Sequence, residues 1–274
     1  MRVSLCNEVV GEINFAAQCA LAKKISYDGL EIAPFTLSND PCRLTTAQRK
    51  KLRNTAGDHG LAITSLHYLL RAPSGLSITS ADNGQRARTV EVMRGLCTLA
   101  ADLGAKILVH GSPDQRKLAN NADEDGRKRG IDCFAAVADA AASSGVTYCI
   151  EPLSRDQTAF VNTIEEASNI VRQIGSPSVK TMLDCSSAAL TETESVPELI
   201  QRWIPTGLIA HVHFNDPNRR GPGDGKLDFS PILKALRDVD YRGDAAIEPF
   251  IYEPDGAACA ARGIGYIRKL MDGG

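Results

Sequence analysis

The tripeptide Ile-Glu-Pro occurs twice in this chain, at the end of VTYCIEP (146–152) and at the end of GDAAIEP (243–249). Each segment is short, rich in apolar residues and bounded by turn formers, which is typical of a buried parallel β-strand. A carboxylate at the end of such a strand is costly to bury without a partner. We therefore expect Glu151 and Glu248 to meet at one end of a barrel and to form part of a site.

Two further apolar runs end in side chains that bind metals. VKTMLDCSS (179–187) brings Asp184 to a strand end, and LIAHVHFND (208–216) brings His211 and His213. Three carboxylates and one imidazole suit a divalent ion such as Mn²⁺, Mg²⁺, Co²⁺ or Zn²⁺. A single carboxylate in such a place also fits a helix cap, whereas four coincident strand ends favour a site. Residues two apart on a strand face the same way, so alternation does not choose between the histidines.

Strand-like and helix-like segments alternate along all 274 residues. The predicted strands cover 3–6, 29–33, 62–67, 107–110, 147–151, 180–184, 209–213 and 245–248. The predicted helices cover 15–24, 46–59, 86–103, 127–143, 164–174, 196–204, 231–237 and 257–271. Eight strand–helix units without a linker predict an α/β fold, a (β/α)8 TIM barrel that forms a single domain over 1–274. The longer insertion at 69–83 is expected to overhang the site as a lid.

The composition limits the class of protein. The formal net charge is −2, with 31 Lys and Arg against 33 Asp and Glu, which argues against a nucleic-acid binder. No apolar stretch approaches the roughly 20 residues needed to span a bilayer, and Glu8 comes too early for a secretory signal. We expect a cytoplasmic protein without membrane association whose eight cysteines are reduced.

The strand order and the strand-end motifs IEP, MLD, HVH and IEP resemble the xylose isomerase-like TIM barrels. This is the sugar phosphate isomerase/epimerase superfamily, which includes ketose 3-epimerases and hydroxypyruvate isomerase-like proteins. The resemblance implies one divalent ion held by Glu151, Asp184, His213 and Glu248. It favours His213 over His211, which is then expected to pack inside the barrel.

The same resemblance implies a small-molecule carbohydrate substrate, which is a ketose, a sugar phosphate or a related keto-polyol. It also implies a homo-oligomer, either a dimer or a tetramer. Arg219, six residues after His213, stands where ketose 3-epimerases carry an arginine that contacts substrate. The segment RRGPGDGKLDF (219–229) is similar to a loop common in the superfamily. Ser187, three residues after Asp184, stands where ketose 3-epimerases carry a histidine that contacts substrate.

Three other strand-end residues are candidates for substrate contact. Glu31 lies near the end of the second predicted strand, and His67 and His110 end the third and fourth. Active sites of TIM barrels lie at this end of the strands. A salt-bridged glutamate and hydrogen-bonded core histidines are the structural alternatives for these positions.

This set of groups suits proton abstraction next to a carbonyl, through an enediolate. Glu151 and Glu248 are the predicted acid and base. Delivery from opposite faces gives an epimer, and transfer between adjacent carbons gives an isomer. Three alternatives remain: a lyase that removes water from a keto-inositol, a nuclease like endonuclease IV, and a sugar-binding barrel without activity. The net charge of −2 and the five histidines disfavour the nuclease.

Overall fold

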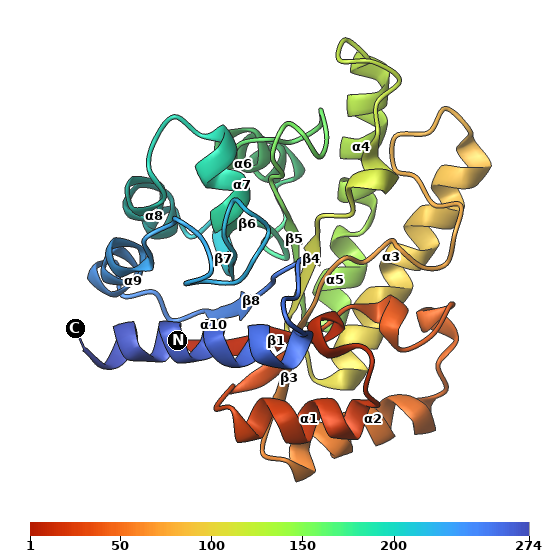
Figure 1. Cartoon of the computed structure of the whole chain (residues 1–274). Helices are drawn as coiled ribbons and strands as arrows, with labels where there is room; N and C mark the ends of the chain where they lie inside the picture. The colour runs from red at the N-terminus through yellow and green to blue at the C-terminus, as the bar shows by residue number, and fades with distance from the viewer. Residues whose placement is uncertain (274) are drawn as a thin grey trace.

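A computed structural model of the chain describes residues 1–273 and shows a closed barrel of eight parallel strands (Figure 1). The strands are β1 (Arg2–Cys6), β2 (Gly29–Ile32), β3 (Ala62–Leu66), β4 (Ile107–His110), β5 (Thr147–Ile150), β6 (Val179–Asp184), β7 (Ile209–Phe214) and β8 (Asp244–Ile247). Each strand pairs with its neighbour in sequence, and β1 pairs with β8 to close the ring. The predicted (β/α)8 fold is confirmed.

Helices surround the strands on the outside of the barrel (Figure 1). The α-helices are α1 (Phe15–Lys24), α2 (Thr46–Asp58), α3 (Asn83–Leu103), α4 (Glu124–Ala136), α5 (Ala138–Ser144), α6 (Ile164–Ile174), α7 (Cys185–Thr191), α8 (Val196–Trp203), α9 (Phe229–Asp238) and α10 (Gly256–Asp272). The short 3-10 helices are η1 (Asn7–Val10), η2 (Pro34–Thr36), η3 (Pro41–Arg43), η4 (Pro113–Arg116) and η5 (Ile204–Thr206). Side-chain caps fix several helix starts; Thr45 and Gln48, for example, form a reciprocal capping box at α2.

Two parts of the helical layer differ from the prediction. The predicted helix at 127–143 is divided into α4 and α5, and the break lies at Val137. There the carbonyl of Ala136 accepts hydrogen bonds from Arg94 Nε and Nη2, at 3.1 and 3.0 Å. Helix α7 was not predicted, because it begins directly after β6 with no loop between them.

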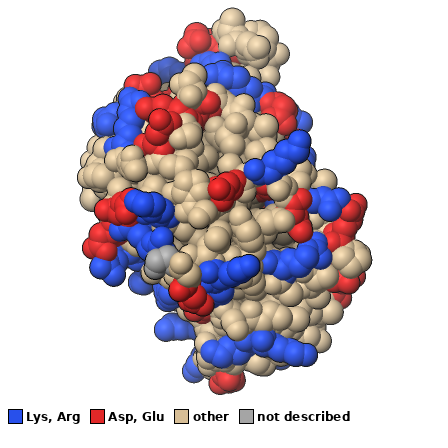
Figure 2. Space-filling model, turned by 60° about the vertical axis from the view of Figure 1, so that its left-hand side comes forward, with Lys and Arg blue, Asp and Glu red and all other residues tan. Residues whose placement is uncertain are grey.

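The barrel separates two packing regions. Inside it, Val109, Cys149 and Met182 form a small apolar cluster, while the larger core lies between the strands and the helices. Across the exposed face in Figure 2, acidic and basic side chains are interspersed without a continuous basic stripe. Among residues 1–273, no helix is both long and apolar enough to cross a bilayer.

Phe229 at the start of α9 provides a test of the outer core. Its buried ring packs edge-on against Phe214 of β7 and Tyr266 of α10, with centroids 5.7 and 6.2 Å apart. We expect Phe229→Ala to lower the free energy of unfolding by about 3–5 kcal/mol, because it leaves a cavity. Urea denaturation measures this, with the exposed Ser230→Ala as control, expected within about 0.5 kcal/mol of wild type. A loss for Phe229→Ala no larger than the control's would contradict this packing.

Candidate functional site

Four side chains meet at the carboxyl ends of β5 to β8. Glu151 directly follows β5, Asp184 ends β6, His213 lies in β7, and Glu248 directly follows β8. The sheet register places Asp184 beside His213 on adjacent strands. The backbone N–H of each glutamate still donates a hydrogen bond to a carbonyl of the neighbouring strand, at 3.2 Å. The hydrogen bonds of the sheet therefore fix the backbone position of both glutamates.

These four side chains are buried, and each offers one ligand atom within 4.8 Å of the other three. His213 Nδ1 lies 3.0 Å from Glu248 Oε2, 3.5 Å from Glu151 Oε1 and 3.9 Å from Asp184 Oδ2. One ring nitrogen therefore points into a group of three carboxylates. The structure brings His213 into this cluster and leaves His211 outside it. We call these four residues the carboxylate cluster.

The electrostatics of the carboxylate cluster favour a cation. Burial and the neighbouring carboxylates of Glu151 and Glu248 raise the pKa of Asp184 to about 7. For His213, burial lowers the pKa, but the carboxylates of Glu248 and Glu31 outweigh it and hold the pKa well above the usual value. Crowded carboxylates disfavour one another's charge, and a bound cation relieves that repulsion. The donor set thus fits a divalent ion.

Two residues that the sequence analysis missed support the cluster. Asn215 Nδ2 donates to Asp184 Oδ2 at 2.6 Å and to Glu248 Oε2 at 3.4 Å. Asn215 lies two residues after His213, so the same alternation that aligns residues two apart could have pointed to it. Gly111 makes room for Glu151, because a Cβ there would come within 2.1 Å of the Glu151 carboxylate.

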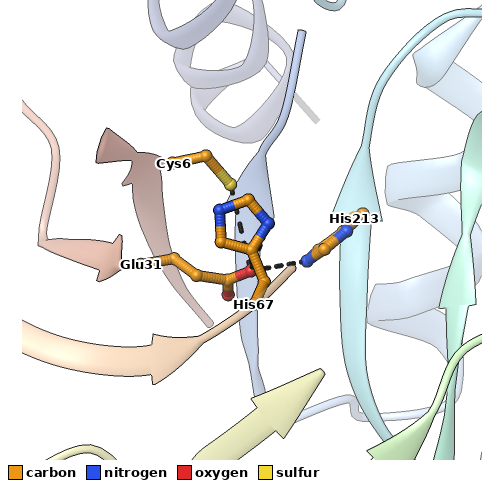
Figure 3. A group of neighbouring side chains, drawn as sticks. All are labelled: Cys6, Glu31, His67 and His213. Carbon is orange, nitrogen blue, oxygen red and sulfur yellow. Dashed lines mark hydrogen bonds and ion pairs between the residues drawn. The ribbon is translucent and has the colours of Figure 1, made fainter. Parts of the chain in front are cut away.

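Glu31 is fully buried, and Figure 3 shows its carboxylate directed toward the ring of His213. Its Oε1 is 2.7 Å from His213 Nε2, and its Oε2 accepts a hydrogen bond from Ser65. His211 Nε2 also lies 2.7 Å from Glu31 Oε2. A carboxylate that holds the far nitrogen of a histidine fixes the ring orientation and leaves Nδ1 to face the cluster.

The two other predicted substrate contacts occupy different surroundings. His67 bridges two carboxylates, with Nδ1 2.8 Å from Glu248 Oε1 and Nε2 2.9 Å from Glu8 Oε2. His110 packs edge-on against Phe134 of α4 at 5.0 Å, and its Nδ1 lies 2.6 Å from the Tyr148 hydroxyl. Burial lowers the pKa of His110 to about 3, which keeps it neutral.

A cavity of about 310 Å³ opens over the carboxylate cluster. Its described lining includes Tyr68, Ser112, Leu153, Gln157, Ser187, Leu190, Asn215, Asp216, Arg219 and Phe250. Arg219 places its guanidinium over the Phe250 ring, 5.1 Å from the centroid, and its carbonyl accepts the Phe250 N–H at 2.9 Å. The described residues that line this cavity do not include Glu31, His67 or His110. Their contact with substrate stays a prediction, and their positions outside the lining do not favour it.

Residues 19–270 match the family model described as xylose isomerase-like TIM barrel. The chain belongs to this family. It is 27% identical to D-psicose 3-epimerase of Agrobacterium fabrum, over 83% of this chain and 76% of that protein. It is 30% identical to L-ribulose 3-epimerase of Mesorhizobium japonicum, over 66% of this chain and 60% of that protein. The crystal structure of D-psicose 3-epimerase from Clostridium cellulolyticum H10 has a TM-score of 0.83 to this chain at 22% identity, covering 98% of this chain and 99% of that one.

The sequence predicted that segment 69–83 overhangs the site as a lid. That prediction is wrong, because no residue of this segment is among the described residues that line the cavity. Leu69, Leu70 and Ile78 are fully buried, and Ile78 N–H donates to the carbonyl of Gln115 at 2.9 Å. The segment therefore packs down onto the loop after β4. Its apolar residues explain the difference, because a lid over an open cavity would expose them to water.

Replacement of Glu31 tests whether it positions His213. We expect Glu31→Gln to weaken divalent-ion affinity by about 10- to 100-fold, because it removes the charge that orients and polarises the imidazole. Calorimetric titration of the metal-free protein with Mn²⁺ measures the change. Asp28→Asn, one residue before β2 and paired with Arg268, is the control and should keep wild-type affinity. Equal affinity in Glu31→Gln and wild type would contradict this role.

Proposed function

We propose that the protein is a divalent-metal-dependent 3-epimerase of an unphosphorylated ketose. The observation that carries the proposal is the carboxylate cluster, with four ligand atoms within 4.8 Å of one another beneath a cavity. The names of the relatives, D-psicose 3-epimerase and L-ribulose 3-epimerase, support the choice of a ketose. We infer a sugar-converting enzyme rather than a sugar-binding barrel, because two potential bases face the cavity.

Glu151, Asp184, His213 and Glu248 would hold the ion. Three carboxylates and one imidazole suit Mn²⁺, which is our choice among the divalent ions. When bound, such an ion polarises the substrate carbonyl and a neighbouring hydroxyl and stabilises an enediolate. Asn215 would keep Asp184 in place, since its amide holds one oxygen of that carboxylate.

Glu151 and Glu248 perform the proton transfers in this proposal. They approach the cavity from β5 and β8, which are not adjacent in the barrel. One carboxylate removes the proton from C3, next to the C2 carbonyl, and the other delivers a proton to the opposite face of the planar enediolate. The configuration at C3 is thereby inverted. The contacts of Glu248 with His67 and His213, at 2.8 and 3.0 Å, fix the direction of its carboxylate.

The charge of the cavity supports a neutral sugar. Six carboxylates line it: Asp114, Glu151, Asp156, Asp184, Asp216 and Glu248. Among the described lining residues Arg219 is the one cationic side chain, and it stacks on Phe250. A phosphate ester would bring further negative charge into this set, so we propose a free ketose.

Glutamine variants test the acid/base assignment. We expect Glu151→Gln and Glu248→Gln each to lower kcat by about 10²-fold or more, since each removes one proton-transfer group. Deuterium incorporation at C3 of D-fructose, D-psicose, D-tagatose and L-ribulose in D₂O, followed by NMR, measures the chemistry. Asp156→Asn, a carboxylate that lines the cavity outside the carboxylate cluster, is the matched control and should keep exchange within about tenfold of wild type. Full activity in either glutamine variant would overturn the assignment.

The phosphate preference has its own test. We expect kcat/KM to be at least roughly tenfold lower for a terminal phosphate ester than for the corresponding free ketose. A tenfold difference corresponds to about 1.4 kcal/mol of repulsion between the phosphate and the carboxylates. Steady-state assays at equal ionic strength give the ratio. A higher kcat/KM for the esters would contradict the neutral substrate. A product that has lost water would contradict the epimerase itself.

A further inference from the structure

A second group of metal-binding side chains lies beside the carboxylate cluster. Cys6, Glu8, His67 and Glu248 each offer a ligand atom, and these four atoms lie within 4.8 Å of one another. Cys6 ends β1, Glu8 lies in the following η1, and His67 follows β3. Figure 3 shows the Cys6 thiol beside the ring of His67.

The two oxygens of Glu248 face different clusters. Oε2 lies 3.0 Å from His213 Nδ1, within the carboxylate cluster, whereas Oε1 lies 2.8 Å from His67 Nδ1. A carboxylate with its oxygens divided in this way can bind one cation through each oxygen. The second group is therefore adjacent to the first and shares only Glu248 with it.

Two polar atoms of the second group have room for a further ligand. Glu8 Oε1 is buried without a hydrogen-bond partner among the described residues, and the Glu8 side chain as a whole is only 12% exposed. The Cys6 thiol is fully buried, and its hydrogen-bond contact is a long one, 3.9 Å to Glu31 Oε1. Buried polar atoms in native proteins almost always have a partner, so the unpartnered Glu8 Oε1 and the weakly bonded Cys6 thiol could both bind a cation.

We propose that Cys6, Glu8, His67 and Glu248 form a second metal site, which takes a thiophilic divalent ion of the Zn²⁺ or Co²⁺ class. One thiolate, one imidazole and two carboxylates give four ligands, the number in most structural zinc sites. A thiolate favours Zn²⁺ or Co²⁺ over Mg²⁺ or Mn²⁺. On binding, the thiol proton of Cys6 leaves to solvent, and His67 keeps one proton on the nitrogen that does not bind.

An overlapping group, Cys6, Glu31, His67 and His213, also has ligand atoms within 4.8 Å of one another (Figure 3). It suits an ion less well, because Glu31 already holds His213 Nε2 at 2.7 Å and accepts from Ser65. An ion there would displace the contact that orients His213. The group with Glu8 leaves that contact intact.

An ion at the second site would tie the loop after β1 and the end of β3 to Glu248. It would therefore position the carboxylate that the proposed function uses as an acid or base. The proposal goes beyond that function and depends on it only through the shared Glu248.

Cobalt binding tests the second site in the full-length chain. After chelation, wild type should bind two Co²⁺ per chain and show the near-ultraviolet thiolate-to-cobalt charge-transfer absorption. Cys6→Ser and Glu8→Gln should each bind one Co²⁺, with the charge-transfer absorption lost in Cys6→Ser and lost or at least halved in Glu8→Gln. The remaining visible absorption of Co²⁺ shows that the carboxylate cluster is still folded.

Cys185→Ser is the matched control, because Cys185 is a buried thiol directly after Asp184 but outside the second group. It should bind two Co²⁺ and keep the charge-transfer absorption. One Co²⁺ without that absorption in wild type, or two Co²⁺ in Cys6→Ser, would overturn the second site and leave the carboxylate cluster standing. No Co²⁺ in wild type would overturn both sites.

Discussion

Burying several carboxylates at one point costs free energy unless positive charge compensates them, and the barrel imposes that situation here. Four consecutive strands, β5 to β8, carry ligand-type side chains at or directly after their carboxyl ends, and closure of the sheet brings these side chains together. Burial, together with the neighbouring carboxylates of Glu151 and Glu248, raises the pKa of Asp184. The fold thus gathers four ligand-type side chains at one point beneath a cavity, and this donor set fits a cation.

The surroundings of the carboxylate cluster restrict how it can bind and react. Glu31 holds the far nitrogen of His213, while Asn215 holds Asp184. His67 and His213 hold the two oxygens of Glu248. These contacts come from β2, from β7 and from the residues directly after β3 and β7, so the geometry of the carboxylate cluster depends on strands beyond β5 to β8. Such fixed side chains suit a reaction in which the proton donor and the proton acceptor must each stay on their own face of the substrate.

The sequence predicted the strand ends well because each ligand lies at the boundary of an apolar run. It predicted less about side chains that meet only in the closed barrel. Glu31, for example, lies more than 180 positions from His213 in sequence yet contacts it at 2.7 Å. For Asp184, both the helix-cap and the metal-site interpretation are consistent with the structure. Its Oδ1 accepts a hydrogen bond from Ser187 N–H at the start of α7, while its Oδ2 faces the carboxylate cluster. His110 ends β4 as predicted, but alternation places its ring against α4, so its contact with substrate stays a prediction.

Anomalous X-ray diffraction from crystals loaded with Mn²⁺ after chelation tests the central claim most directly. We expect one strong Mn²⁺ peak within coordinating distance of Glu151, Asp184, His213 and Glu248, and its loss in His213→Ala crystals. No peak among these four side chains at saturating Mn²⁺ would mean that their convergence is structural. The proposed epimerase chemistry would then lose its basis.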